Sequence, residues 1–368
     1  MEYFDFKDGI KLSRLGMGNM RLPMKPNSEE IDYEKSQEII DYAMANGINY
    51  YDTAYVYSKG DSERFLGFAM KKYKRDSFYL ATKWHYDANP NYKEVFQEQL
   101  KRLQTDYIDF YLIHCLTDSN IDKYIASGGI EFFMEMKRIG KIKYLGFSSH
   151  AGVETLKRFR DYTNWDFAQL QINYFDWMYS STKEEYEILR EKGIKTFVME
   201  PVRGGRLASL NEDASRLLKA SKPNFSIASW ALRFVRGLDN VGVILSGMSS
   251  LEQIIDNVNT FNDDYCLKDS DKKLLFKACD IFHKSLSIPC TGCRYCLDDC
   301  PIEINIPAYL KLFNEYKISG YDALEDKDEI KTVGHPKDCI SCGACMGLCP
   351  QKIKIPDILE ELKNLLKE

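Results

Sequence analysis

Two matching runs of cysteines near the C-terminus constrain this chain more than any other feature of its sequence. Each run has the spacing Cys-x2-Cys-x2-Cys-x3-Cys-Pro, so three cysteines lie close together and a fourth directly precedes a proline. The two runs hold most of the eleven cysteines in the 368-residue chain. They consist of Cys290, Cys293, Cys296 and Cys300 in the first run, and Cys339, Cys342, Cys345 and Cys349 in the second.

This spacing is typical of bacterial ferredoxins that carry two [4Fe–4S] clusters. A short turn can wrap the first three thiolates around one cluster, while the cysteine before proline ligates the other cluster. Zinc sites more often use pairs of C-x2-C, and disulfides fit poorly with a chain that has no secretory signal. We therefore expect two ligand sets, one of Cys290, Cys293, Cys296 and Cys349, the other of Cys339, Cys342, Cys345 and Cys300.

Composition and charge exclude several other classes of protein. With a net charge of −5 and no basic stripe, the chain gives no reason to expect a nucleic-acid partner. It has no apolar run of about eighteen residues that would span a membrane. The segment Met1–Phe6 has neither the basic nor the apolar region of a secretory signal, so reduced thiols and oxygen-sensitive clusters predict a cytoplasmic location. Cys115, Cys266 and Cys279 have apolar neighbours, and we expect them to be buried small hydrophobes.

The first two thirds of the chain alternate β-rich apolar runs with amphipathic helical stretches, after a hairpin expected at Tyr3–Phe6 with a turn at Asp8–Gly9. Eight such units in about 250 residues favour a closed (β/α)8 barrel. The alternative, an open doubly wound sheet, is less favoured because no G-x-G-x-x-G follows the first strand. The expected strands are Leu12–Met17, Ile48–Asp52, Phe78–Thr82, Ile108–Ile113, Ile142–Phe147, Phe167–Ile172, Ile194–Met199 and Val241–Leu245. The expected barrel helices are Tyr33–Ala45, Ser62–Tyr73, Tyr92–Leu103, Gly129–Ile139, Val153–Tyr162, Lys183–Glu191, Phe225–Arg236 and Leu251–Thr260.

The fold class is therefore α/β, a (β/α)8 TIM barrel followed by a mainly helical, ferredoxin-like iron–sulfur domain. We expect the barrel at residues 1–265, a linking helix at 266–286 and the iron–sulfur domain at 287–368. The 38 residues between the two cysteine runs (301–338) are many for a compact two-cluster ferredoxin, and apolar spacing predicts a helix there at Pro307–Lys317. A further helix is expected after Pro356.

Polar residues of reactive types stand near the ends of successive expected strands. In a (β/α)8 barrel, catalytic residues occupy the C-terminal ends of strands and the loops that follow. Asp52 ends the second barrel strand and Tyr57 lies in the loop behind it, whereas Lys83 follows the third strand and His114 the fourth. One such residue alone could serve packing or lie on the surface. The presence of all four predicts an active site at the mouth of the barrel.

With the D-T-A-x-x-Y signature at 52–57, residues 1–265 resemble the aldo-keto reductase family, and the whole chain resembles its branch with a C-terminal ferredoxin domain. The resemblance implies that Tyr57 donates a proton to a carbonyl oxygen as hydride reduces the carbonyl. Lys83, held charged by Asp52, would lower the pKa of Tyr57, and His114 would orient the substrate oxygen. Histidine at that position, rather than glutamate, favours carbonyl over C=C reduction. Tyr55 competes for the acid role, but its offset from Asp52 differs from that of the family acid.

The same resemblance implies a site for NADP(H) or NAD(H). Ser148, Ser149 and Gln171 would hold the nicotinamide carboxamide, and Met199 takes the place where many members have an aromatic residue. Gly247 and Gln253 stand where NADPH-specific members have cations for the 2′-phosphate, which weakens the case for NADP(H). The remaining expected contacts are Pro201, Arg203, Gly204 and Gly205 at the pyrophosphate, with Ser249, Ser250 and Asn257 at the adenosine end.

A nicotinamide transfers two electrons as hydride, whereas a [4Fe–4S] cluster passes one electron at a time. This mismatch leaves three hypotheses. The first is an NAD(P)H-dependent oxidoreductase for a small carbonyl or alcohol, with clusters that serve a separate redox partner such as ferredoxin. The second is a barrel that holds a flavin such as FMN and is linked to ferredoxin. The third is a non-catalytic electron-transfer or scaffold subunit.

Overall fold

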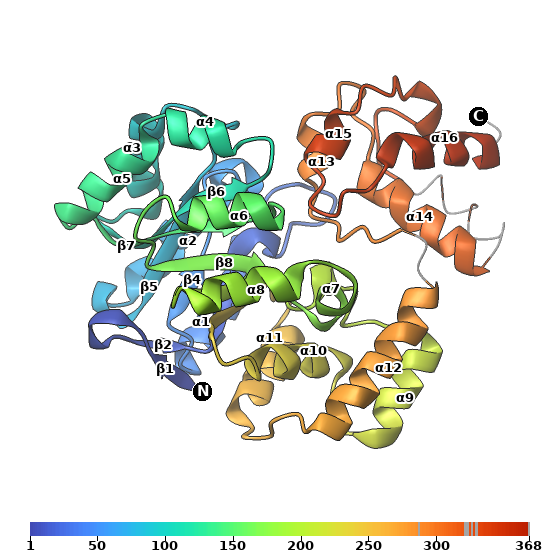
Figure 1. The fold of residues 1–368 in the computed structure, drawn as a ribbon, viewed down its shortest axis with the longest axis horizontal. Helices are drawn as coiled ribbons and strands as arrows, with labels where there is room; N and C mark the ends of the chain where they lie inside the picture. The colour runs from blue at the N-terminus through green and yellow to red at the C-terminus, as the bar shows by residue number, and fades with distance from the viewer. Residues whose placement is uncertain (286–287, 320–323, 325–326, 328–329, 367–368) are drawn as a thin grey trace. The chain divides into compact units, whose positions relative to one another are not determined.

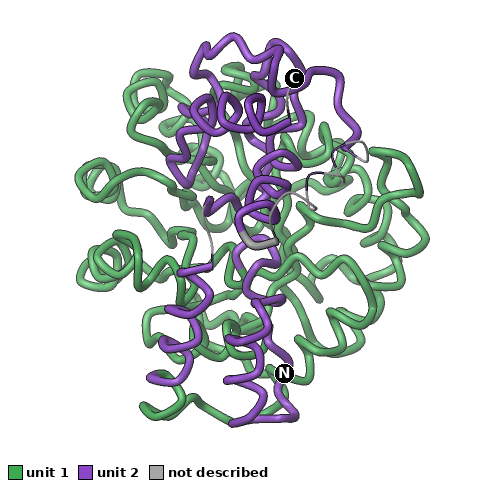
Figure 2. The backbone as a smooth tube through the Cα atoms, turned by 90° about the vertical axis from the view of Figure 1, so that its right-hand side faces the viewer, with its two compact units in different colours: residues 1–202, 228–272 green, residues 203–227, 273–368 purple. Residues whose placement is uncertain are grey.

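The structure, a computed structural model, describes the whole chain except residues 286–287, 320–323, 325–326, 328–329 and 367–368 (Figure 1). Backbone contacts divide the chain into two compact units, residues 1–202 with 228–272, and residues 203–227 with 273–368 (Figure 2). These units differ from the domains expected from the sequence. Residues 203–227, which were expected in the barrel, belong to the unit that contains the cysteine runs, as does most of the linking helix.

Eight parallel strands in the described part of the chain close into a barrel, in the order β10-β3-β4-β5-β6-β7-β8-β9. This confirms the expected (β/α)8 fold. The expected strand Leu12–Met17 is instead two strands, because β2 (Lys11–Ser13) pairs with β1 (Tyr3–Asp5) in the N-terminal hairpin and only the next strand enters the barrel. The barrel strands are β3 (Leu15–Gly18), β4 (Tyr50–Asp52), β5 (Tyr79–Trp84), β6 (Ile108–Leu116), β7 (Ile142–Ser149), β8 (Phe167–Gln171), β9 (Lys195–Met199) and β10 (Val241–Ser246).

The longer barrel helices follow the strands as the apolar periodicity predicted. Among the described helices, five begin at a side chain that accepts a backbone amide, and these caps are Asp32 of α1, Asn91 of α3, Asn173 of α7, Asn211 of α9 and Ser250 of α11. No helix among the described residues is both long and apolar enough to cross a membrane. The helices of residues 1–262 are α1 (Tyr33–Ala45), α2 (Asp61–Ala69), α3 (Tyr92–Leu103), α4 (Ile121–Ala126), α5 (Gly129–Arg138), α6 (Val153–Arg160), α7 (Tyr174–Tyr179), α8 (Thr182–Glu191), α9 (Glu212–Ser221), α10 (Ile227–Arg236) and α11 (Leu251–Asn262).

The N-terminal hairpin brings aromatic side chains into the core of the barrel. Phe6 lies 5.6 Å from Phe110 and 5.7 Å from Phe197, measured between ring centroids, and Phe4 lies 6.3 Å from Phe197. These rings belong to one apolar cluster with residues from the barrel strands, among them Tyr50 and Val243. Asp52 and Lys83 come later on β4 and β5 than Tyr50 and Ala81, which belong to this cluster, so the polar residues lie toward the C-terminal ends of the strands.

The second unit has its own apolar core, to which buried residues of its helices contribute Leu310, Phe313, Leu359 and Leu362. An isolated parallel bridge between Ile304 and Gly334 connects the segments that lead from one cysteine run to the other. The helices from residue 269 onward are α12 (Asp269–Ser285), α13 (Tyr295–Asp298), α14 (Ile306–Ser319), α15 (Ala344–Gly347) and α16 (Ile355–Leu366).

One expectation about the isolated cysteines is wrong. Cys115 and Cys279 are buried, but Cys266 is exposed. It lies between α11 and α12 in a segment without helix or strand, where its neighbour Leu267 is buried. Consecutive side chains of an extended segment point to opposite sides, so the burial of Leu267 leaves Cys266 facing solvent.

Candidate active site and iron–sulfur sites

The four reactive residues predicted at the barrel mouth lie on neighbouring elements and are all buried. Asp52 ends β4, Lys83 lies on β5 and His114 on β6, while Tyr57 begins a 3-10 segment (Tyr57–Gly60) after β4. The order β4-β5-β6 places these strands side by side. Lys83 is 0% exposed and Asp52 is 3% exposed, so their charges are almost fully removed from water.

The ammonium group of Lys83 connects the catalytic candidates. Its Nζ donates to Asp52 Oδ1 at 2.5 Å, to the backbone oxygen of Thr53 at 2.6 Å and to Tyr57 Oη at 3.3 Å. The same nitrogen lies 4.7 Å from the centroid of the Tyr57 ring. A lysine ammonium has three protons to donate, and these three acceptors match that number. The Lys83 side chain is therefore held in one position beside the phenol.

Burial controls the protonation of these groups. It raises the pKa of Asp52 and lowers the pKa of Lys83, while the attraction between the two opposes both shifts. The pKa of Tyr57 is raised well above its ordinary value, first by burial and then by the charge of Asp52. The net shift of the Tyr57 pKa is therefore upward, and the expected lowering by Lys83 stays a prediction. Tyr57 stays a neutral phenol that keeps the proton a general acid must donate.

His114 completes the group at the barrel mouth. Its ring lies 5.7 Å from the Tyr57 ring in an edge-to-face arrangement, measured between centroids. Burial holds the pKa of His114 well below its ordinary value, and the charge of Lys83 acts in the same direction. The ring is therefore a neutral imidazole. Its buried Nδ1 has no hydrogen-bond partner among the described residues, so a substrate oxygen or a water could use it.

Tyr55, the competitor for the acid role, is directed elsewhere. Its hydroxyl donates to Glu98 Oε2 at 2.8 Å, and the guanidinium of Arg102 lies 4.4 Å from the centroid of its ring. Glu98 and Arg102 both belong to α3. The structure thus places the hydroxyl of Tyr57, and not that of Tyr55, beside the Lys83 ammonium.

The residues expected at the nicotinamide are engaged with the protein in this structure. Ser148 Oγ accepts the Cys115 amide at 2.8 Å, and Ser149 Oγ accepts the Ala151 amide at 3.1 Å. Gln171 Nε2 donates to Asp176 Oδ2 at 2.7 Å. Met199 ends β9, and its sulfur lies 3.6 Å from Gln169 Nε2. These bonds fix the side chains of the two serines and Gln171.

The backbone and inner side-chain carbons of Arg21, which the sequence analysis missed, lie beside two residues of the expected adenosine end. A Cβ atom added to Gly247 would lie 3.5 Å from Arg21 Cβ, and Ser249 Oγ donates to the backbone oxygen of Arg21 at 2.5 Å. The guanidinium of Arg21 is paired with Glu200 Oε1 at 2.9 Å. Of the other expected contacts, Gln253 Oε1 accepts the Ser249 amide at 2.7 Å, Ser250 caps α11, and Asn257 Nδ2 donates to Ser246 Oγ at 3.0 Å.

The positions of Arg21 and Glu200 in the barrel could have indicated that they are functional residues. Arg21 stands three residues after the end of β3, and Glu200 directly follows β9. Both therefore occupy the loops in which barrel enzymes place functional groups. Glu200 adopts a φ of 55°, in the left-handed region that residues other than glycine seldom occupy. Backbone of this kind is concentrated at functional sites.

The loop expected to wrap a pyrophosphate divides between the two units. Pro201 belongs to the first unit, whereas Arg203, Gly204 and Gly205 belong to the second. Arg203 is 2% exposed, and its Nη2 donates to Gln351 Oε1 at 2.8 Å. Its expected role as a phosphate contact therefore stays a prediction, and in this structure it contacts the segment after the last cysteine.

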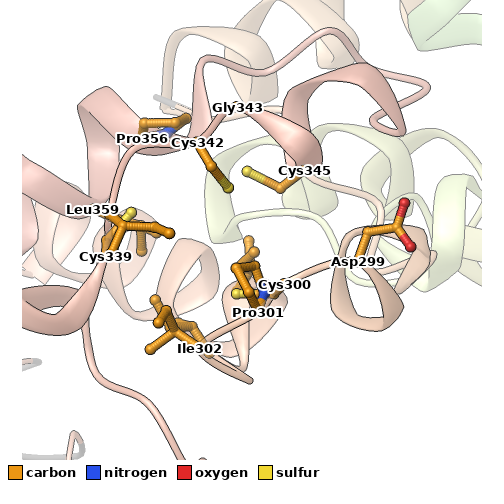
Figure 3. Close-up of a pocket in the computed structure, with 13 residues that line it drawn as sticks. Asp299, Cys300, Pro301, Ile302, Cys339, Cys342, Gly343, Cys345, Pro356 and Leu359 are labelled. Atoms are coloured by element: carbon orange, nitrogen blue, oxygen red, sulfur yellow. The ribbon is translucent and has the colours of Figure 1, made fainter.

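The eight cysteines of the two runs gather in the combinations expected from their spacing. The thiols that act electrostatically on Cys296 include Cys293, Cys290 and Cys349, and those that act on Cys345 are Cys339, Cys300 and Cys342. A pocket is lined by the whole second set together with apolar residues such as Ile304 and Leu359 (Figure 3). The two expected ligand sets are thus two groups of neighbouring thiols. Their role as ligands stays a prediction.

Both thiol groups suit a bound metal cluster chemically. Burial raises the pKa of Cys296, and it raises the pKa of Cys345 to about 11. Buried neutral thiols become thiolates when they bind metal, with release of protons. Within the described residues no three such side chains converge closely enough to hold a metal ion. Binding a cluster would therefore require the thiols to turn toward one another.

The two cysteine loops repeat the same backbone conformation. Gly292 and Arg294 of the first run have φ of 68° and 69°, and at the same places in the second run Ser341 and Gly343 have 53° and 77°. Each run then enters a four-residue helix, α13 or α15. Successive amides in turns of this kind form concave sites for anions, so the repeat extends from the cysteines to the backbone that would surround a cluster.

Comparisons with known proteins agree with this architecture. A sequence model described as "Aldo/keto reductase family" matches residues 14–274, and one described as "4Fe-4S dicluster domain" matches residues 289–353. Because the first match covers most of the sequence, the chain belongs to the aldo/keto reductase family, and it has a C-terminal region of the 4Fe-4S dicluster type.

Several relatives are similar over the barrel. The uncharacterized oxidoreductase YqkF of Bacillus subtilis (strain 168) is 29% identical over 287 residues, which cover 69% of this chain and 88% of YqkF. The NADH-specific methylglyoxal reductase of Escherichia coli (strain K12) is 25% identical over 313 residues, 72% of this chain and 94% of that protein. The structure of aldo-keto reductase AKR11C1 from Bacillus halodurans (holo form) aligns with a TM-score of 0.63 and 29% identity, and covers 76% of this chain and 96% of that chain.

Proposed function

We propose that this oxidoreductase reduces a small carbonyl compound to an alcohol with a nicotinamide dinucleotide. The observation that carries the proposal is the buried contact of Lys83 Nζ with both Asp52 and Tyr57. The dinucleotide, when bound, supplies hydride to the carbonyl carbon. Tyr57 donates its proton to the carbonyl oxygen, and the neutral ring of His114 holds that oxygen. One hydride and one proton convert the carbonyl to the alcohol.

The residues present fit a dinucleotide better than the sequence suggested. Arg21 has its backbone and Cβ beside Ser249 and Gly247 and directs its guanidinium to Glu200. Its pairing with Glu200 leaves less of its charge for a 2′-phosphate, because the carboxylate competes for the same guanidinium. We therefore propose NADH as the better reductant. The NADH specificity stated in the name of the Escherichia coli methylglyoxal reductase is consistent with this choice.

We further propose that the thiol groups hold two [4Fe–4S] clusters, which supply single-electron transfer when bound. Cys290, Cys293, Cys296 and Cys349 would hold one cluster, and Cys339, Cys342, Cys345 and Cys300 the other. Such clusters imply a redox partner, for which a ferredoxin has the right chemistry. Eight reduced thiols also suit a reducing compartment such as the cytoplasm.

The variant Tyr57→Phe tests the proposal, with Tyr55→Phe as its matched control. Purified without oxygen and assayed with methylglyoxal and other aldehydes against NADH, Tyr57→Phe is expected to lose about 10²–10⁴-fold in kcat/KM, because the general acid is removed. Tyr55→Phe, which loses only a contact with α3, should retain activity. Both should keep the iron of the wild type.

Equal activity in Tyr57→Phe and wild type would show that the acid is misassigned.

A visible spectrum of the purified protein tests which cofactor the barrel holds. Bound flavin absorbance would replace the nicotinamide proposal by the flavin-containing, ferredoxin-linked alternative. Failure of the wild type to reduce any aldehyde with NADH or NADPH would favour an electron-transfer or scaffold role.

A further inference from the structure

The first cysteine group has two arginines close to it that come from outside the cysteine runs. Arg203 donates to the side chain of Gln351, which stands two residues after Cys349. The backbone amide of Gln351 is in turn hydrogen-bonded to the Cys349 thiol and lowers its pKa, against the effect of burial. A chain of contacts thus connects Arg203 through Gln351 to a predicted ligand of the first cluster.

Arg206 makes a second connection to the same group. The amide of Arg206 donates to the backbone oxygen of Arg203 at 3.2 Å, so the two residues share one turn. Cys290, Arg203 and Glu315 are the groups whose electrostatic interactions with Arg206 affect its pKa, which burial lowers. Cys290 is the first predicted ligand of the same cluster. The two arginines therefore connect to opposite ends of one ligand set, all within the second unit.

The second cysteine group has different surroundings. Among the described residues that line its pocket, Asp299 is the one with a charged side chain. Cys342 is exposed, and Ile340 is 61% exposed. Two groups with the same spacing and backbone turns thus differ in charge and in access to water.

Placing two cations in one turn, Arg203 buried and Arg206 partly buried, costs free energy unless negative charge offsets it. Glu315 supplies part of that charge, but it is also paired with Lys311 at 3.4 Å. A cluster held by four thiolates is anionic, and reduction adds a further negative charge. Cations close to a cluster stabilise its reduced form and raise its potential. Water around the more exposed second group acts in the same direction there, so a higher potential at the first site requires the arginines to have the larger effect.

We propose that Arg203 and Arg206 are positioning residues that balance the charge of the first iron–sulfur site and make its reduction potential higher than that of the second. The loop after β9 then serves the iron–sulfur region as well as the barrel. This inference rests on the proposed clusters, but it does not depend on the carbonyl reaction.

The test is a redox titration of the oxygen-free full-length protein, followed by electron paramagnetic resonance. We expect two midpoints in the wild type. Arg206→Gln should move the higher midpoint to a more negative potential and leave the lower one in place, whereas Arg206→Lys should retain the wild-type value. Lys337→Gln, which removes an exposed cation two residues before Cys339, should leave the higher midpoint unchanged.

Loss of about half the iron in Arg206→Gln, with full iron in Arg206→Lys, would also support charge balance at one site. Equal midpoints in the wild type, unchanged midpoints in Arg206→Gln or loss of iron in both variants would each overturn the inference. A wild type without iron–sulfur absorbance would instead overturn the proposed clusters themselves, so the two failures are distinguishable.

Discussion

The barrel mouth and the cysteine region differ in how their candidate reactive sites are built. At the barrel mouth, Asp52, Tyr57, Lys83 and His114 come from different elements, and Lys83 already contacts two of the other three. In the cysteine region, three predicted ligands of each set come from one loop of seven residues, such as 290–296. These thiols lie near one another without converging on a common point.

The difference shows what each site depends on. The barrel site is held by internal pairs of buried charges, so removal of one partner leaves the other unpaired in a dry environment. The cysteine sites are held by backbone turns and by the apolar core beneath them, and metal would complete them. The barrel site should therefore be sensitive to lost charge, and the cysteine region to changes in backbone packing.

The largest expected effect is that of Lys83→Met on the barrel. The substitution leaves the Asp52 carboxylate buried without its cation, which costs about 3–5 kcal/mol of unfolding free energy. It should also reduce carbonyl turnover by at least about 10²-fold, since Tyr57 loses its neighbour. Denaturant unfolding and NADH-dependent assays measure the two effects separately.

The matched control is the double variant Asp52→Asn with Lys83→Met. Because it removes both charges, it should regain most of the lost stability and none of the activity. Equal stability of Lys83→Met and wild type would show that the buried pair does not hold the barrel mouth together.

A smaller effect is expected from Gly334→Ala in the cysteine region. Its new Cβ would meet the backbone oxygen of Ile302 at 2.2 Å, and backbone cannot move aside as a flexible side chain can. We expect a loss of about 1–3 kcal/mol from overpacking, seen as a lower melting temperature for the loss of iron absorbance. Gly347→Ala, where a Cβ meets no atom within 4 Å, should behave as wild type. Equal melting temperatures of wild type, Gly334→Ala and Gly347→Ala would show that the close approach of Gly334 to the Ile302 backbone does not affect stability.

A further effect, which accumulates with each pH unit, concerns the pH dependence of barrel stability. Burial lowers the pKa of His150 to about 4, from 6.5. In the unfolded chain His150 therefore binds a proton below pH 6.5, whereas in the folded chain it binds one only below about pH 4. The free energy of unfolding therefore falls as the pH falls from 6.5 to 4. One such histidine changes the free energy of unfolding by about 1.4 kcal/mol for each pH unit within this window.

His150→Gln should remove that part of the slope when unfolding free energy is measured between pH 6.5 and 4. An unchanged slope in His150→Gln would mean that His150 is protonated equally in the folded and unfolded chain.

Long amphipathic helices were predictable because their apolar periodicity is a local property. The expected α1 and α3 agree with the structure at both ends. The short α4 and α7 give too few turns for a periodic signal. α9 was missed although Asn211 caps it and acidic residues fill its first turn, which is a signal that could have found it.

The sequence by itself predicted the two cysteine groups, because the spacing places three thiols in one loop and the ferredoxin pattern assigns the fourth from the other run. It also determined the barrel, whose eight units each have a recognisable apolar pattern. Only the tertiary structure decided which polar side chains contact one another. Arg21 pairs with Glu200 and lies beside Gly247. Arg203 contacts Gln351, and the Tyr55 hydroxyl is directed to α3. Arg21 and Glu200 are 179 residues apart in the chain. Contacts of that kind leave no local pattern, since closure of the barrel and the packing of each loop bring their partners together.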